Sequence, residues 1–271
     1  MIDVLPLFPQ LDSSLIEVLS GLSPQQWNTD TICKKWRVKD IVAHLLDGAI
    51  RRLSIGRDGY KMAVAEINNQ TELLDYLNNL NAGWISAFER VSPEILIAQL
   101  KTIQEELYLY LKGLDPDDNA IFPVSWAGDE ISDNRFDIAR EFTERWLHQQ
   151  QIRQAVGARS LLDRHLYNPF LEICMKALPY HFRDLSPAIN TMVSLEIVGD
   201  AGAVWSIIRR EQKWEFTFAE RQADAHVYID QNIAWMLFSK GIDIYESGQY
   251  WQVTGDQDLG RHVLLMRSFM V

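Results

Sequence analysis

Between residues 38 and 53 the hydrophobic positions repeat with the spacing of one face of an α-helix. Val38, Ile41, Val42 and Leu45 follow the i, i+3, i+4, i+7 pattern, which continues to Leu53. Ser92 followed by Pro93 marks another helix start, with an N-cap residue and a proline at the first helical position. Periodicity, caps and stop signals together predict further helices over about 11–22, 71–90, 93–112, 135–156 and 161–178.

After about residue 190 the period changes to two. Val193, Leu195 and Ile197 alternate with polar residues, which is typical of a strand with one buried face. Similar patterns predict strands around 214–218, 225–229 and 249–254, and helices over 231–240 and 258–270. The pattern therefore favours an α+β protein with a helical domain at 1–160, a helical connector at 161–189 and a small α/β domain at 190–271.

A segment of low periodicity separates two of the predicted helices. Residues 114–134 contain two prolines, several aspartates and a glycine, so we expect a loop. A loop of this length inside a compact domain often serves a function.

Composition and charge exclude several classes of protein. The chain has 271 residues, 47% of them hydrophobic, and a net charge of −11, so it can bury a sizeable core. An acidic chain is unsuited to nucleic acid or an anionic membrane surface. We find neither an apolar run long enough to cross a bilayer nor the features of a signal peptide. Two cysteines cannot form a disulfide framework, so we expect a cytoplasmic protein with reduced thiols.

One pair of residues on the helix predicted at 135–156 has the spacing of metal ligands. Glu144 and His148 are four residues apart, so their side chains lie on the same helical face, and His44 on helix 38–53 is a candidate third ligand. An ordinary solvated pair is the alternative, because all three residues lie away from the apolar stripes of their helices. Gly48 lies one turn after His44 on the same helical face. Glycine is unfavourable inside a helix, so its presence favours a functional face if the reason for it is a close approach of another group.

Other polar residues carry weaker signals. Three histidines, His165, His181 and His262, have no partner at ligand spacing, and His226 falls on the solvent side of its strand. Trp36 is expected to pack at the start of the helix that carries His44.

Two segments resemble a known family of metal-binding proteins. Residues 36–45, WRVKDIVAHL, resemble the Trp-x-Val-x-Asp-Val-x-x-His-Leu signature of the DinB/YfiT-like four-helix bundles, with Ile41 as the only departure. The later segment Glu144-x-x-x-His148-x-x-x-Ile152-Arg153-x-Ala155-x-Gly157 is similar to the last bundle helix of the mycothiol-dependent maleylpyruvate isomerases. The stretches 203–205, 223–225 and 253–256 resemble their C-terminal domain, which is similar to sterol carrier protein type 2 and has a mostly antiparallel sheet.

This resemblance implies a site and a chemistry. It implies that His44, Glu144 and His148 bind a divalent metal, zinc foremost, with nickel, iron or manganese also compatible. It further implies a low-molecular-weight thiol such as mycothiol as cosubstrate, and either cis–trans isomerisation of an unsaturated keto acid or S-transfer. The expected partners are thus a small thiol and a small anionic substrate. Arg51 and Arg140 lie on the ligand faces and are candidates to bind the substrate carboxylate; the sequence assigns no general acid or base.

Two other functions remain open from the sequence. The chain would be a non-catalytic binding protein if it kept the metal and held an apolar ligand in its C-terminal domain. It would be a metal-dependent hydrolase if metal-bound water replaced the thiol.

Overall fold

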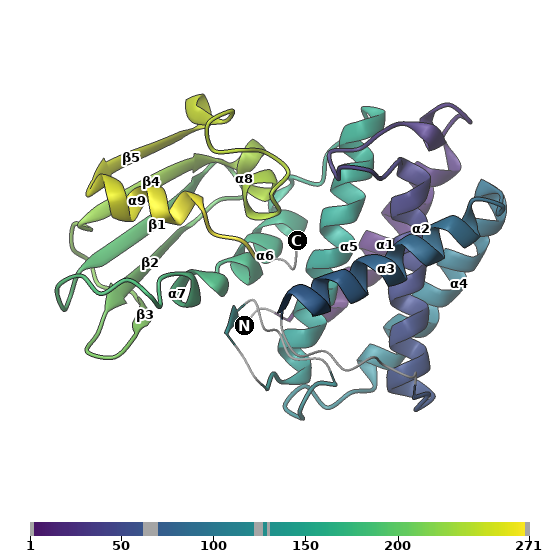
Figure 1. The fold of residues 1–271 in the computed structure, drawn as a ribbon, viewed down its shortest axis with the longest axis horizontal. Helices are drawn as coiled ribbons and strands as arrows, with labels where there is room; N and C mark the ends of the chain where they lie inside the picture. The colour runs from purple at the N-terminus through teal and green to yellow at the C-terminus, as the bar shows by residue number, and fades with distance from the viewer. Residues whose placement is uncertain (1–2, 62–69, 122–126, 129–130, 269–271) are drawn as a thin grey trace. The chain divides into compact units, whose positions relative to one another are not determined.

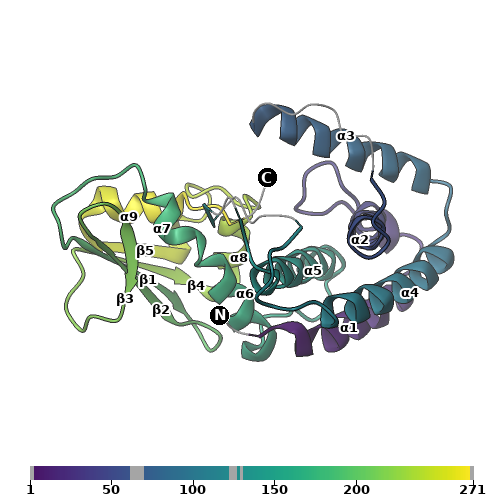
Figure 2. The ribbon, with the colours of Figure 1, turned by 90° about the horizontal axis from the view of Figure 1, so that it is seen from below.

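The computed structural model describes residues 3–61, 70–121, 127–128 and 131–268. These residues form two compact units (Figures 1 and 2). The helical unit comprises Asp3–Ile121 and Asp133–Ser160, and the sheet unit is formed mainly by the chain from Leu161 onwards. Among the described helices, none combines the length and the apolar character needed to span a membrane.

The helical unit is built from five helices along the described chain: α1 (Phe8–Ser20), α2 (Val38–Arg52), α3 (Gln70–Phe88), α4 (Pro93–Lys112) and α5 (Asn134–Val156). Short 3-10 turns lie at Leu5–Leu7 and Gln26–Asn28, and a π-helical turn over Leu53–Arg57 extends α2. Helix α2 contacts α3, α4 and α5, while α1 contacts α4 and α5 (Figure 2). The helix that carries His44 therefore touches the helix that carries the other two candidate ligands.

The ends of these helices follow the signals in the sequence. Ser92 caps α4 by accepting a hydrogen bond from the Ile95 backbone N–H at 3.4 Å, and Asp133 caps α5 through the Phe136 N–H at 2.7 Å. Helix α5 ends at Gly157, whose φ of 68° is the left-handed conformation that favours glycine. The predictions for 93–112 and 135–156 are thus confirmed to within a residue.

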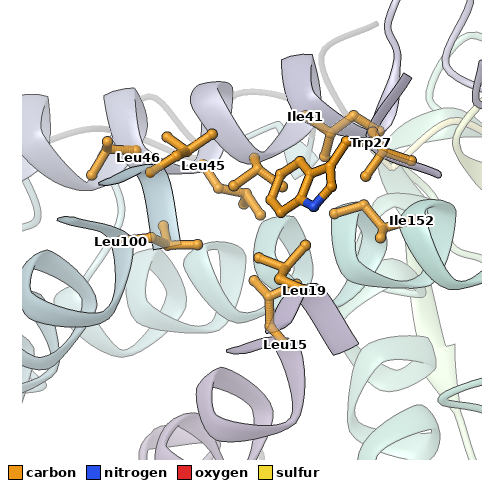
Figure 3. Packing of buried hydrophobic residues seen from close by; sticks show 11 residues of the cluster. Leu15, Leu19, Trp27, Ile41, Leu45, Leu46, Leu100 and Ile152 are labelled. Carbon is orange, nitrogen blue, oxygen red and sulfur yellow. The ribbon is translucent and has the colours of Figure 1, made fainter. Parts of the chain in front are cut away.

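A hydrophobic core joins four of the helices (Figure 3). Trp27, from the 3-10 turn before α2, packs among leucine and isoleucine side chains at 4% exposure. Its buried neighbours come from α1, α2, α4 and α5 and include Leu15, Leu19, Ile41, Leu45, Leu46, Leu100 and Ile152. The apolar face that the sequence predicted for residues 38–53 is the face of α2 that packs into this core.

The sheet unit contains the helices α6 (Arg164–Cys174), α7 (Ala177–His181), α8 (Gln231–Phe238) and α9 (Gln257–Leu264). Its strands are β1 (Met192–Val198), β2 (Val204–Arg209), β3 (Trp214–Thr217), β4 (Ala225–Asp230) and β5 (Trp251–Gly255), which follows the 3-10 turn Gly248–Tyr250. They form a five-stranded sheet in the order β3-β2-β1-β4-β5. Strands β1 and β4 are parallel and the other pairs antiparallel, so the α+β class with a mostly antiparallel sheet is confirmed.

Three elements of the sheet unit differ from the prediction. The helix expected at 161–178 is two helices, because Pro179 has no N–H to continue the ladder beyond Met175. Strand β2 was not predicted, since its apolar residues at 204, 205, 207 and 208 do not alternate strictly. Helix α9 ends at Leu264, well before residue 270, and the following chain is held by the Ser268 hydroxyl, which donates to the Cys174 carbonyl at 2.9 Å.

Candidate metal centre

The candidate ligands come from two packed helices of the helical unit. His44 projects from α2, and Glu144 and His148 project from successive turns of α5. One ligand atom from each residue lies within 4.8 Å of the other two. The structure therefore brings the three residues together, and the triad could bind a metal ion.

The distances within the triad suit a small divalent cation. His148 Nε2 lies 3.4 Å from Glu144 Oε2, and the His44 and His148 ring centroids are 4.8 Å apart at an interplanar angle of 73°. Ligand bonds of about 2.0–2.2 Å in a tetrahedral site place two ligand atoms roughly 3.4 Å apart. The nitrogen and oxygen donors thus fit the group that the resemblance implies, with a small closing movement of His44.

Trp36 forms an aromatic wall beside both imidazoles. Its ring centroid lies 4.8 Å from that of His44 and 6.0 Å from that of His148. The backbone around Trp36 is fixed, because the Thr31 hydroxyl donates to its carbonyl at 2.8 Å and its own N–H donates to the Cys33 carbonyl at 3.0 Å. The tryptophan expected to pack at the start of the helix therefore also borders the candidate centre.

The protonation states of His44 and Glu144 favour metal binding. Burial, aided by the nearby charge of His148, lowers the pKa of His44 to about 3. Burial raises the pKa of Glu144, but the hydrogen bond and charge of His148 outweigh this effect and leave the pKa at about 2. At neutral pH His44 is therefore neutral and Glu144 is ionised, which are the forms that coordinate a cation. The Glu144 side chain keeps 39% of its surface exposed, so the centre is recessed yet open.

The two arginines predicted to bind substrate lie close to the triad, and each is paired with an aspartate. Arg51 Nε is 2.9 Å from Asp47 Oδ2, and Arg140 Nη2 is 2.7 Å from Asp137 Oδ1. The charge of Arg51 acts to lower the pKa of His44, and that of Arg140 acts to lower the pKa of Glu144. A role of either arginine in substrate binding stays a prediction.

The structure bears on the glycine in the ligand face of α2. The sequence left open whether a close approach is the reason for Gly48. A Cβ atom added there would meet nothing within 4 Å among the described residues. No described part of the chain therefore requires a glycine at this position, one turn after His44.

Three polar residues near the triad were not found from the sequence. Gln151 Oε1 lies 2.8 Å from His148 Nδ1, and Asn81 of α3 interacts with His44. Cys33 is half-buried, and burial together with the charge of Glu144 raises its pKa to about 11. The spacing of Gln151, three residues after His148, was the available signal, whereas Cys33 and Asn81 reach the site only through the tertiary fold.

The remaining histidines form other arrangements, within the sheet unit. His181 and His262 stack with ring centroids 4.1 Å apart, so they do have each other as partners. His226 stacks on Tyr228 and places Nε2 3.2 Å from Glu196 Oε2. Neither arrangement belongs to a cluster of three metal-ligating side chains within the described chain.

Comparisons with known proteins agree with this architecture. Residues 8–153, more than half of the chain, match the family described as mycothiol maleylpyruvate isomerase N-terminal domain. A crystal structure of a histidine-to-alanine mutant of mycothiol-dependent maleylpyruvate isomerase is similar in fold, with a TM-score of 0.57 and 10% identity over 92% of this chain and 91% of that one. A second crystal structure of mycothiol-dependent maleylpyruvate isomerase gives a TM-score of 0.53 and 11% identity over 86% of each chain. No curated protein matches the sequence.

Proposed function

Because the chain belongs to the mycothiol maleylpyruvate isomerase N-terminal domain family, we propose that it is a metal-dependent enzyme that uses a low-molecular-weight thiol as cosubstrate. It either isomerises the double bond of a small unsaturated keto acid or transfers the thiol to a small electrophile. The observation that carries the proposal is the convergence of His44, Glu144 and His148 from two helices onto one point.

The donor set narrows the identity of the metal. Two imidazoles and one carboxylate suit zinc, and nickel, iron or manganese would also be accepted. When bound, such a cation stabilises the thiolate form of a thiol at neutral pH and holds it in a fixed position. With three protein ligands, the cation would keep a coordination position open to an exogenous sulfur.

The chain's own thiols are unsuited to act as the nucleophile, which favours a thiol from outside. The sequence has two cysteines, Cys33 and Cys174. Burial raises the pKa of Cys33 to about 11 and that of Cys174 well above its usual value. Both are therefore protonated at neutral pH, whereas the thiolate is the reactive form.

The proposed reaction needs no net proton transfer. The thiolate sulfur adds to an alkene carbon conjugated with a carbonyl, and the alkene electron pair moves to the carbonyl oxygen as an enolate. The former double bond is then single and rotates. Return of the electron pair expels the sulfur and leaves the trans isomer with the thiolate regenerated. S-transfer results instead when addition is followed by protonation, or when sulfur displaces a leaving group.

The residues around the triad have proposed roles in binding and orientation. Trp36 covers one side of the two imidazoles and limits the directions from which a substrate can approach. Arg51 and Arg140 are the proposed carboxylate-binding groups, since each guanidinium lies near a candidate ligand and could form a charge-assisted hydrogen bond.

Metal content per chain of tag-free protein, measured by plasma mass spectrometry, tests the site. We expect about one equivalent of a transition metal in the wild type and in Gln154→Ala, an exposed position on the same helix, and its loss in His148→Ala. Absence of metal from the wild type, with no uptake of added zinc or nickel, would contradict the proposal.

A thiol-by-thiol activity screen then tests the chemistry. We expect turnover of an unsaturated keto acid or an electrophile to depend on both metal and thiol. Turnover of esters without thiol would identify a hydrolase, and a metal-loaded, inactive protein carrying an extracted apolar ligand would identify a binding protein.

A further inference from the structure

The two candidate imidazoles each have an amide side chain as a polar neighbour. His148 Nδ1 lies 2.8 Å from Gln151 Oε1, and Gln151 is itself buried at 5% exposure. With the amide oxygen of Gln151 facing the ring, that oxygen accepts, so this orientation places a proton on Nδ1 of His148. Nε2, which lies 3.4 Å from Glu144 Oε2 and donates to that carboxylate when it is protonated, is then the nitrogen that would bind a cation after losing its proton.

His44 has a corresponding neighbour on α3. Its Nδ1 and the Oδ1 atom of Asn81 are both buried, and neither forms a well-aligned hydrogen bond with a described residue. Asn81 nevertheless lies close enough to His44 to influence it as a hydrogen-bonding side chain. A hydrogen bond between these two atoms would satisfy both at once, which is favourable because an unpaired buried polar atom is costly.

The position of α3 supports this pairing. Trp84, one turn after Asn81, donates from its indole Nε1 to the carbonyl of Ala43 at 2.9 Å. Ala43 immediately precedes His44, so this bond fixes α3 against the turn of α2 that carries the histidine. Trp84 also stacks on Phe88 at 4.5 Å, which holds the indole in place.

We propose that Gln151 and Asn81 are positioning residues that hold the Nδ1 protons of His148 and His44, so that both histidines present Nε2 to the metal. The proposal rests on the metal site proposed above. Hydrogen bonds of this kind orient ligating imidazoles and raise their basicity. They also favour assembly of the site, since the rings need not change tautomer when the cation enters.

The tautomer of each ring can be measured without metal. Long-range ¹⁵N–¹H spectra of the metal-free chain distinguish Nδ1–H from Nε2–H, with signals assigned through His44→Gln and His148→Gln. We expect His148 to carry its proton on Nδ1 in the wild type and in Gln151→Glu, which keeps an acceptor oxygen. Gln151→Ala should shift the population toward Nε2–H, and Gln154→Ala should leave it unchanged. Finding no proton on Nδ1 of His148 in the wild type would overturn the assignment.

Zinc affinity, measured by competition with a chromophoric chelator, gives a second readout. Loss of such a partner typically weakens metal binding about 10- to 100-fold. We expect that loss in Gln151→Ala and Asn81→Ala, recovery in Gln151→Glu and Asn81→Asp, and no change in Asn79→Ala, an exposed asparagine of α3. Unchanged affinity in both alanine variants would overturn the proposed role.

The two readouts separate this proposal from the one on which it rests. If the wild type binds no zinc, the metal site is wrong, and the tautomer measurement still decides whether Gln151 holds the His148 proton. If zinc binds with equal affinity in the wild type and both alanine variants, the metal site stands and the positioning role fails.

Discussion

At the scale of single residues, the open space beside the triad is marked by a glycine. Gly48 lies in the interior of α2, where glycine is unfavourable by about 1 kcal/mol relative to alanine. Among the residues that the structure describes, nothing lies within 4 Å of a Cβ added there, so packing against them does not require the glycine. A glycine that weakens its helix and is not required by the described packing is consistent with space kept clear for a ligand one turn from His44.

The substitution Gly48→Ala tests this interpretation. We expect the free energy of unfolding to rise by up to about 1 kcal/mol, because alanine is the better helix former and meets no clash. If the space holds thiol or substrate, KM should rise while the metal content stays unchanged. Gly83→Ala in α3 is a matched control, since a Cβ there also meets nothing within 4 Å. Gly83→Ala should stabilise the protein and leave KM at the wild-type value. If Gly48→Ala also has the wild-type KM, the space beside Gly48 is not used by thiol or substrate.

Residue spacing could predict the candidate ligands, but it could not predict which residues surround them. His44, Glu144 and His148 were identifiable because four-residue spacing and the resemblance both pointed to them. Their helical faces looked solvated, since periodicity places them away from the apolar stripes. They are half-buried or buried because two polar faces meet between α2 and α5. Cys33 and Asn81 join them from other segments, and no local period encodes such long-range contacts.

At the scale of secondary structure, α5 is a largely buried helix that is rich in charged and amide side chains. Several of its polar groups pair with groups of other helices. Arg145 pairs with Asp12 of α1 at 2.6 Å, and Arg153 donates to the Ser14 carbonyl of α1 at 3.0 Å. A buried charge is tolerated only when it is paired in this way. This helix therefore depends on a polar network in addition to apolar packing.

Asp137 is the point in that network at which one substitution should have the largest effect. It accepts hydrogen bonds from Arg52 of α2 and from Arg140, and it is 1% exposed. We expect Asp137→Ala to lower the free energy of unfolding by about 3–5 kcal/mol, because buried cations lose their counter-ion. Asp117→Ala, which removes the exposed partner of Arg135, should cost no more than about 1 kcal/mol. Urea titrations of both variants measure the difference, and equal midpoints would contradict the expected role.

Helices and strands with a regular hydrophobic period and clear capping residues could be predicted from the sequence. Elements whose ends or existence depend on tertiary contacts could not. Helices α4 and α5 begin and end close to the predicted residues because Ser92, Asp133 and Gly157 encode their ends locally. Strand β2 was missed because its apolar and polar residues do not alternate strictly. It is a strand because it pairs with β1 on one side and β3 on the other. The end of α9 depends on bonds from Ser268 to Cys174 and Phe238, which are remote in sequence.

At the scale of the whole molecule, all three candidate ligands belong to the helical unit. A cation that binds the folded triad and not the unfolded chain stabilises by RT ln(1 + [L]/Kd), about 2.7 kcal/mol at a hundredfold excess over Kd. We expect zinc to raise the melting temperature of the metal-free chain, and His148→Ala to abolish the shift while Gln154→Ala keeps it. If calorimetry resolves two transitions, one alone should move. A shift of equal size in His148→Ala would place zinc elsewhere.

The sheet unit contributes a pH dependence of its own through His181. Burial lowers the pKa of His181 to about 4. The hydrogen bond to the His262 carbonyl partly opposes this decrease. The charges of His262, Arg267 and Arg183 reinforce it. In the unfolded chain the ordinary value is about 6.5. Between these two values the unfolded state binds a proton that the folded state does not, so stability falls as pH drops through this window.

Replacement of His181 by glutamine should therefore flatten the acid side of the stability profile. The imidazoles of His181 and His262 each place Nε2 on the other's carbonyl, at 2.8 and 3.0 Å, and His181→Gln keeps an N–H donor without a titrating ring. We expect urea midpoints measured from pH 7 to pH 4 to fall less steeply in His181→Gln than in the wild type. His165→Gln, which removes an exposed imidazole of α6, serves as the control and should follow the wild-type slope. Parallel slopes in all three proteins would mean that the stacked pair takes up its proton in the folded state, and that burial does not keep His181 neutral.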